Sequence, residues 1–168
     1  MKPPTLRYRM AFASTLLVVL FCTPELRADD WPQWRGPNRD GIWRETGIVK
    51  AIPRSGLKVR WRAKIGRGYS GPVIAKGRVF VTDQVFDPEL ERVLCFDETT
   101  GDPVWTHSYP VDYEHMEYGN GPRASPTVHD GRVYTLGTQG DLCSLDATTG
   151  DLFWQKILEK EYDAQISR

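Results

Sequence analysis

The sequence predicts an all-β protein, a β-propeller built from four-stranded antiparallel blades. The main observation is an eleven-residue pattern that occurs twice in the 168 residues, at 95–105 and 144–154, so that Asp97 and Asp146 lie 49 positions apart. A second phrase precedes each copy, at 71–80 and 125–134, with an offset of 54. A period of about 40 to 55 residues with several short strands is typical of propeller blades. The chain is therefore expected to carry two blades of an incomplete ring.

The first 28 residues predict a secretory signal peptide. A basic start precedes an apolar run of 13 residues, Met10–Cys22, and Pro24 then ends any helix. Cleavage is expected after the small residue Ala28. The run is shorter than the ~20 residues that a membrane span needs, which disfavours an uncleaved anchor. Phe21 stands where a lipid-attachment site needs a small residue, which disfavours lipidation at Cys22.

Composition limits the class of protein further. The whole chain has 22 basic and 22 acidic residues, and removal of residues 1–28 leaves 18 and 21, a net charge of −3. Nothing in this balance indicates a nucleic-acid partner. We expect a mildly acidic protein, periplasmic or secreted, with no membrane span once the signal peptide is removed.

Two segments are predicted between the signal peptide and the first blade. Residues 29–56 are rich in Trp, Arg, Pro and Gly and are expected to form an irregular arm over the ring. Residues 57–66 are expected to form an isolated outer strand, in which Trp61 matches the repeat tryptophans. In a closed ring such an N-terminal strand would complete the last blade and remove its open edge.

Each blade is predicted from short strands bounded by turns, and helix signals are nearly absent. Blade 1 occupies 67–109, the connector loop 110–123, blade 2 124–158 and the C-terminal tail 159–168. The strands are expected at 72–75, 78–82, 92–96 and 103–107, and then at 126–128, 132–136, 141–145 and 152–156. Blade 1 has five extra residues, within 83–92. Several strands are apolar at consecutive positions, which indicates burial on both faces.

The turns have a physical basis in the sequence. Lys76-Gly77 and Asp130-Gly131 are tight hairpin signals, because glycine accepts a positive φ. In the segment 97–101 the aspartate can accept backbone N–H bonds across the turn, and the closing glycine takes the left-handed position before the last strand. The segment 146–150 repeats this arrangement.

The repeated pattern, small-x-Asp-x-x-Thr-Gly-x-x-x-Trp, resembles the tryptophan-docking motif of the quinoprotein alcohol dehydrogenase-like propellers, the PQQ-repeat family. Its residues here are Asp97, Thr100, Gly101 and Trp105, then Asp146, Thr149, Gly150 and Trp154, with Cys95 or Ser144 in place of the usual alanine. The stretches 31–41 and 118–126 are similar to parts of secreted bacterial members. The resemblance covers 29–158 and implies an apparently truncated member. We expect the tryptophans to stack on neighbouring blades, where an indole can lie flat on a glycine-containing peptide.

The loop 107–123 and its counterpart 66–70 are expected near the mouth of the central channel, where propellers usually bind ligands. The channel-mouth candidates are Tyr69, Tyr118, Asn120 and Arg123. A structural role for Arg123, bonded to carbonyls between blades, is favoured. Residues 66–71 satisfy the dinucleotide pattern G-x-G-x-x-G, but a strand follows in place of a helix, which argues against a nucleotide site.

The histidines are expected to lie on the surface or in loops, and the two cysteines of the mature chain are expected to be buried. His107, His115 and His129, with Asp112 and Glu114, do not have the spacing of a compact metal motif. Cys95 and Cys143 point to facing surfaces of neighbouring blades. Packed sheets lie ~10 Å apart, whereas a disulfide needs Cα atoms within about 7 Å. Two buried free thiols are therefore the preferred interpretation over a disulfide.

We expect an exported structural or binding scaffold with no catalytic, cofactor-binding or metal residues. The alternative is the N-terminal part of a PQQ-dependent quinoprotein dehydrogenase of alcohols or sugars. The family resemblance implies that such an enzyme needs PQQ with calcium, a catalytic aspartate and, in many members, two adjacent cysteines. The sequence has no Cys-Cys pair. Partners are unknown, and further blades or self-association are expected to close the ring.

Overall fold

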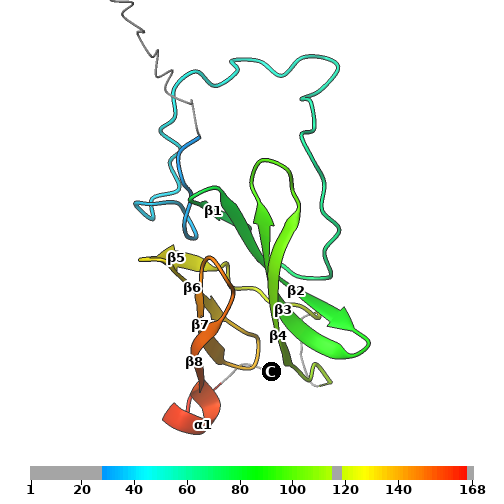
Figure 1. Ribbon diagram of the computed structural model, residues 1–168, viewed down its shortest axis with the longest axis vertical. Coiled ribbons are helices and arrows are strands. Elements are labelled where there is room, and N and C mark those ends of the chain that lie inside the picture. The colour runs from blue at the N-terminus through cyan, green and yellow to red at the C-terminus, as the bar shows by residue number, and fades with distance from the viewer. Residues whose placement is uncertain (1–27, 115–118, 166–168) are drawn as a thin grey trace, which may run out of the picture.

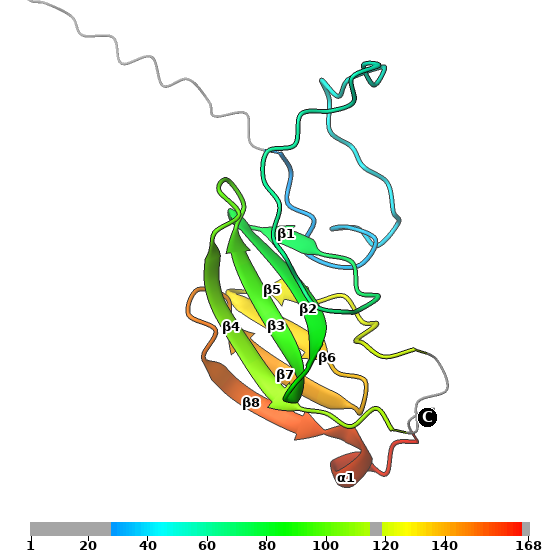
Figure 2. The ribbon, with the colours of Figure 1, turned by 90° about the vertical axis from the view of Figure 1, so that its right-hand side faces the viewer.

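Two four-stranded antiparallel sheets make up the computed structural model, which describes residues 28–114 and 119–165. Their strand orders are β1-β2-β3-β4 in blade 1 and β5-β6-β7-β8 in blade 2. The sheets pack face to face (Figures 1 and 2). The predicted all-β fold of two propeller blades is thus confirmed. The predicted signal peptide, apart from Ala28, lies outside the described residues.

Blade 1 has a longer central hairpin than blade 2. Its strands are β1 (Val73–Ala75), β2 (Arg78–Phe86), β3 (Glu89–Asp97) and β4 (Pro103–Pro110). The β2 and β3 ladder continues through the pair Phe86 and Glu89. The extra residues predicted within 83–92 therefore extend one hairpin of the sheet and do not form a separate loop.

Blade 2 matches the predicted strands closely. Its strands are β5 (Thr127–His129), β6 (Arg132–Leu136), β7 (Asp141–Asp146) and β8 (Leu152–Ile157). A short helix that was not expected, α1 (Leu158–Tyr162), follows β8 and begins at the last residue of the predicted blade 2. Glu161 accepts the backbone N–H of Ile157 at 3.1 Å, which satisfies one of the unpaired donors at the helix start.

The core lies between the two blades. It joins Phe80, Val93 and Cys95 of blade 1 to Val133, Cys143 and Leu145 of blade 2. We call the face of each blade that carries Phe80 or Tyr134 its far face, and the opposite face its near face. The far face of blade 1 packs on the near face of blade 2.

The segment 57–67, called the strap, covers the near face of blade 1. The prediction of an outer strand at 57–66 is wrong: the structure has no strand there, and Arg67 makes a single bridge with Gln84. A strand needs a hydrogen-bonded neighbour, and no backbone hydrogen bond joins residues 57–66 to a strand of the described residues. Trp61 and Ala63 nevertheless pack on the near-face cluster of Val79, Val81, Leu94 and Phe96.

The N-terminal arm connects the inner strands of both blades. Trp31 exchanges backbone hydrogen bonds with Ile74 of β1, and the carbonyl of Pro32 accepts the N–H of Val128 in β5. Residues 40–60 then leave the blades in a wide arc, drawn in cyan in Figure 1. Among the described residues, no helix has the length and apolar character that crossing a membrane requires.

Candidate functional site

Three of the four channel-mouth candidates lie together. The guanidinium of Arg123 stands 5.4 Å from the ring centre of Tyr69. It also donates to the carbonyls of Gly119, at 3.0 Å, and Gly121, at 3.3 Å. Asn120 lies between these two glycines, half-buried, and Tyr118 lies outside the described residues. The side chain of Arg123 therefore stabilises its own connector loop by bonding two of its carbonyls. The exposed ring of Tyr69 lies beside it.

The two connectors touch backbone to backbone at this place. Gly121 has a φ of 124°, and a methyl group on it would lie 2.7 Å from the Cα of Gly68. The N–H of Tyr69 donates to the carbonyl of Pro122 at 2.8 Å. Gly68 belongs to the G-x-G-x-x-G stretch, which leads into β1 and not into a helix. The close approach of these two backbone segments explains why position 68 is a glycine.

A buried carboxylate that the sequence analysis missed joins the blades. Glu91 on β3 is 1% exposed. It accepts hydrogen bonds from the hydroxyls of Tyr109, at 2.8 Å, and Tyr113. Thr138 of blade 2 donates its backbone N–H to both carboxylate oxygens at 3.2 Å and adds its hydroxyl. Glu91 shares its face with Val93 and Cys95, so the signal available in the sequence was an acidic residue at a buried position of an extended strand.

Burial, and after it the carboxylate of Glu91, shift the pKa values of the two tyrosines that bond it. Burial and then the charge of Glu91 raise the pKa of Tyr109 far above its ordinary value, and burial and the hydrogen bond to Glu91 raise the pKa of Tyr113. Both phenols are thus locked as hydrogen-bond donors. Two phenols, a hydroxyl and a backbone N–H occupy the carboxylate, which suits an interblade link better than a general base.

A second buried carboxylate fixes the strap. Asp83 is fully buried and receives two bonds from the guanidinium of Arg92, at 2.8 and 2.6 Å. The backbone N–H of Gly66 also donates to it. A methyl group on Gly66 would lie 2.0 Å from the carbonyl oxygen of Gln84. The end of the strap is therefore held tightly, in contrast to residues 57–65.

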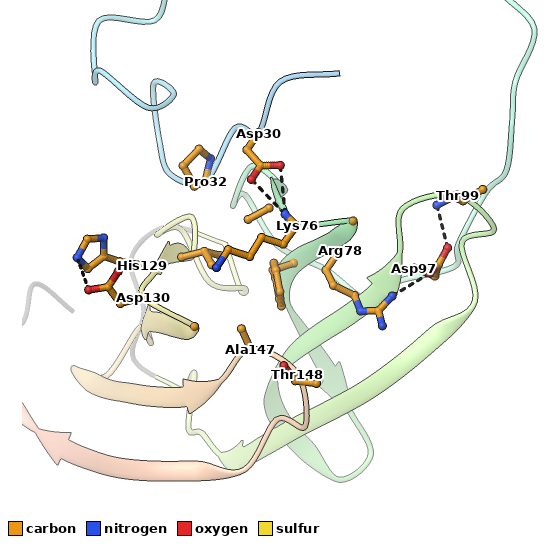
Figure 3. Close-up of a pocket in the computed structure, with 15 residues that line it drawn as sticks. Asp30, Pro32, Lys76, Arg78, Asp97, Thr99, His129, Asp130, Ala147 and Thr148 are labelled. Atoms are coloured by element: carbon orange, nitrogen blue, oxygen red, sulfur yellow. Dashed lines mark hydrogen bonds and ion pairs between the residues drawn. The ribbon is translucent and has the colours of Figure 1, made fainter. Parts of the chain in front are cut away.

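A cleft of about 480 Å³ lies between the blades below the arm (Figure 3). Its polar groups alternate in sign. The N–H of Lys76 donates to both carboxylate oxygens of Asp30, at 3.1 and 3.2 Å, and Arg78 bonds Asp97 at 2.8 Å. His129 and Asp130 lie 3.4 Å apart on the opposite rim. Acidic and basic groups are nearly balanced, so the cleft does not select a strongly charged ligand.

Trp105 and Trp61 each contact a glycine of the repeated pattern. The indole of Trp105 lies where a methyl group on Gly150 would be, 2.6 Å from its Cδ2, and its N–H donates to the carbonyl of Ala147 at 3.2 Å. Trp61 repeats both contacts on blade 1, 2.5 Å from a methyl group on Gly101, with an N–H bond of 2.8 Å to the carbonyl of Glu98. The contribution of these contacts to the free energy of unfolding stays a prediction.

The aspartates of the pattern close the turns below these glycines. Asp97 accepts the N–H groups of Thr99 and Thr100, at 2.9 and 3.0 Å. Asp146 accepts those of Thr148 and Thr149, at 2.7 and 2.9 Å. These backbone bonds lower the pKa of both carboxyl groups. The turns thus present Gly101 and Gly150 in fixed positions, with φ near 80°.

The far face of blade 2 repeats the far face of blade 1 position by position. Across the sheet, the first row is Val73, Phe80, Cys95 and Trp105 in blade 1 and Thr127, Tyr134, Ser144 and Trp154 in blade 2. The second row is Thr82, Val93 and His107, matched by Leu136, Leu142 and Lys156. Phe80 and Val93 are buried, whereas Leu136 is 39% exposed.

The cysteines and histidines considered in the sequence lie in surroundings that do not favour reactivity or metal binding. Cys95 and Cys143 are free thiols in the shared core, and burial raises the pKa of each to about 11. Burial lowers the pKa of His107, and His115 lies outside the described residues. Within 28–114 and 119–165, no three His, Cys, Asp or Glu side chains are grouped so that they could hold a metal ion.

Comparisons with known proteins agree with the repeat. A family model described as outer membrane protein assembly factor BamB matches residues 45–168. The outer membrane protein assembly factor BamB of Yersinia pestis is 25% identical over 123 residues, which is 68% of this chain and 30% of that protein. The quinohemoprotein alcohol dehydrogenase from Comamonas testosteroni has a similar structure, with a TM-score of 0.59 and 22% identity over 79% of this chain and 20% of that chain. The chain thus spans less than a third of the length of either relative.

Proposed function

The chain belongs to the PQQ-repeat family, and from that premise we propose that it is an exported scaffold module of the periplasm. Its role is to bind another protein unit through a blade face and not to carry out redox chemistry. Its relative from Yersinia pestis is named an assembly factor of outer membrane proteins, which supports both the compartment and a role in protein contacts. The predicted signal peptide supports export.

The observation that carries the proposal is the far face of blade 2, on which no other sheet of the described residues packs. It combines the aromatic pair Tyr134 and Trp154, whose ring centres lie 6.2 Å apart, with the exposed side chain of Leu136. The matching residues of blade 1 form the interblade core. Exposed apolar patches of this kind mark interaction surfaces.

The residues present do not fit the cofactor of the alternative, a dehydrogenase with PQQ and calcium. A calcium ion needs several oxygen ligands. The two buried carboxylates of blade 1 are already occupied, Asp83 by Arg92 and Glu91 by tyrosine and threonine donors. The sequence identity to the quinohemoprotein enzyme is 22%, so this similarity supports a shared fold and not a shared activity.

A duplication experiment tests the scaffold. A second copy of residues 111–157 is inserted directly after Ile157, which adds a third blade with its own connector. If the far face of blade 2 is a docking surface, Trp154 becomes protected from N-bromosuccinimide oxidation, and the free energy of unfolding rises. The matched control carries Asn at the Gly150 position of the added blade, which fills the space for the indole. Equal oxidation of Trp154 in the parent, the duplicated chain and the control would contradict the proposal.

The same purified chain tests the alternative. We expect neither saturable quenching of tryptophan fluorescence by PQQ with calcium nor dye reduction with alcohols or sugars. Quenching that saturates at micromolar PQQ, together with dye reduction, would replace the scaffold by the dehydrogenase. Monodispersity must be shown first, because uncovered blade faces and sheet edges favour aggregation.

A further inference from the structure

The structure contains both halves of one interface, and one half is uncovered. In the contact that the chain makes internally, the far face of blade 1 places Trp105 over Gly150 on the near face of blade 2. The uncovered half is the far face of blade 2. Its rings are already arranged for the same contact: Tyr134 and Trp154 lie 6.2 Å apart at 49°, against 5.8 Å and 46° for Phe80 and Trp105.

The near face of blade 1 is the matching receptor. Its residues are Val79, Val81, Leu94, Phe96 and Gly101, at the positions that Val133, Thr135, Cys143, Leu145 and Gly150 hold in blade 2. The turn carbonyls match as well, since Glu98 of blade 1 corresponds to Ala147 of blade 2. A chain with both surfaces can therefore repeat its own interblade contact with another copy.

Residues 57–65 of the strap are the competitor for this receptor, and they are weakly attached. Between residues 57 and 65, all of which the structure describes, the only hydrogen bond to blade 1 is the indole bond of Trp61. Trp61 and Ala63 supply its packing on the near face. The far face of blade 2 would bring the additional apolar side chains of Tyr134, Leu136 and Leu142. The strap has the advantage of being tethered, which gives it a high effective concentration.

We infer that a second copy of this chain docks head to tail on the first, with the far face of blade 2 on the near face of blade 1. Trp154 of one copy then takes the position of Trp61 on Gly101 of the other, and residues 57–65 of the strap are released. The inference rests on the proposed function, because it names the partner of the same face. The contact is heterologous, so each copy uses a different surface.

The test uses sedimentation equilibrium on the full chain and on three variants. Trp61→Ala removes the competing ring and leaves the receptor open, so we expect a dissociation constant at least about tenfold lower than that of the parent chain. Gly101→Asn keeps the backbone, because Asn tolerates positive φ better than most residues other than glycine, but its side chain fills the space for either indole. Gly131→Asn is its control, since Gly131 has a φ of 73° and open space around it.

Mixing decides the geometry. Trp61→Ala/Trp154→Ala keeps an open receptor without the indole of the far face, and Gly101→Asn keeps the far face without a receptor. We expect each to be monomeric alone and the two to form a 1:1 complex when mixed. Circular dichroism and denaturant unfolding establish that every variant is folded. Gly131→Asn should associate like the parent chain.

Three results would overturn the inference. The first is a monomeric mixture of folded variants. The second is a dimer of Gly101→Asn alone, which would mean that two far faces pair with each other. The third is that the parent chain and Trp61→Ala are both monomeric at every concentration measured, as expected if the partner is a further blade of a longer polypeptide. If the duplicated chain still protects Trp154, the scaffold stands and only the second copy is lost.

Discussion

Blade 1 and blade 2 have the same strand order and the same turn chemistry, but they differ in what covers them. Blade 1 lies between the strap and blade 2, so that Val79, Val81, Phe80 and Val93 are all buried. Blade 2 is covered on its near face by blade 1, whereas Leu136 and Phe153 are 39% and 51% exposed. Burial in this protein is therefore set by the neighbouring blade and not by the residue pattern alone.

The two blades also differ at the end of the central hairpin. The longer hairpin of blade 1 adds a third row to its far face, with Gln84, Glu91 and Tyr109. In blade 2 the hairpin ends at Leu136, and the N–H of Thr138 after it reaches Glu91. A long hairpin facing a short one creates the polar link between the blades. The far face of blade 2 has no such row.

The largest effect should come from exchanging the two repeat tryptophans for alanine. Trp105→Ala should lower the free energy of unfolding by about 3–5 kcal/mol, as large-to-small changes in a core do. Trp154→Ala should cost only about 1 kcal/mol under monomeric conditions, since it loses chiefly the ring contact with Tyr134. Urea unfolding measures both, with Trp43→Ala, at a site 57% exposed, as the surface control. Equal losses for the two repeat tryptophans would remove the distinction between covered and uncovered faces.

A smaller loss of unfolding free energy is expected at the polar link around Glu91, between blade 1 and blade 2. Glu91→Gln keeps the volume but places an NH₂ group among the donors of Tyr109, Tyr113 and Thr138, and should cost about 3 kcal/mol. Tyr113→Phe removes a single donor and should cost about 1 kcal/mol. Denaturant unfolding gives both values, with the exposed substitution Glu114→Gln as reference. A neutral Glu91→Gln would mean that the buried carboxylate does not hold the blades together.

The smallest expected effect is a loss of stability at low pH that depends on the aspartates of the two repeated turns. The pKa values of Asp97 and Asp146 are lowered from 3.8, first by backbone N–H bonds, and Asp97 also bonds Arg78. A lowered folded-state pKa gives stability that is present above the unfolded value and is lost as the pH falls through the folded value. Stability should therefore fall below about pH 4, and less steeply in Asp97→Asn and Asp146→Asn. Thermal unfolding between pH 5 and pH 2 measures the slopes, and an unchanged slope in both variants would contradict this assignment.

The repeat predicted the strands because local signals and tertiary packing agree there. The hairpin glycines, the Asp-x-x-Thr-Gly turns and the consecutive apolar positions all depend on residues close in sequence, and the observed strands follow them within a few residues. Residues 57–66 were predicted as a strand from a similar pattern. Backbone pairing requires a neighbour that a single segment cannot supply, so the side-chain contacts of Trp61 formed without a strand.

The candidate site was harder to predict, because its residues come from separate elements. Tyr69 and Arg123 could be placed near one another, since they occupy equivalent connectors of successive units. Glu91 and Thr138 lie 47 positions apart outside the repeated phrases. An acidic residue is ordinarily solvated, and only the hairpin extension and the short loop of the next blade bring its donors together.

Each sheet follows the chain order without a crossover, and this sets an order of events during synthesis. Every backbone ladder joins strands that are adjacent in sequence, so blade 1 can complete its hydrogen bonding before β5 is available. The contacts of greater separation, such as Trp105 with Ala147 and Glu91 with Thr138, are side-chain contacts added when blade 2 arrives. Repeated units propagate from a completed neighbour. Blade 1 is thus the sheet that forms first and on which blade 2 packs.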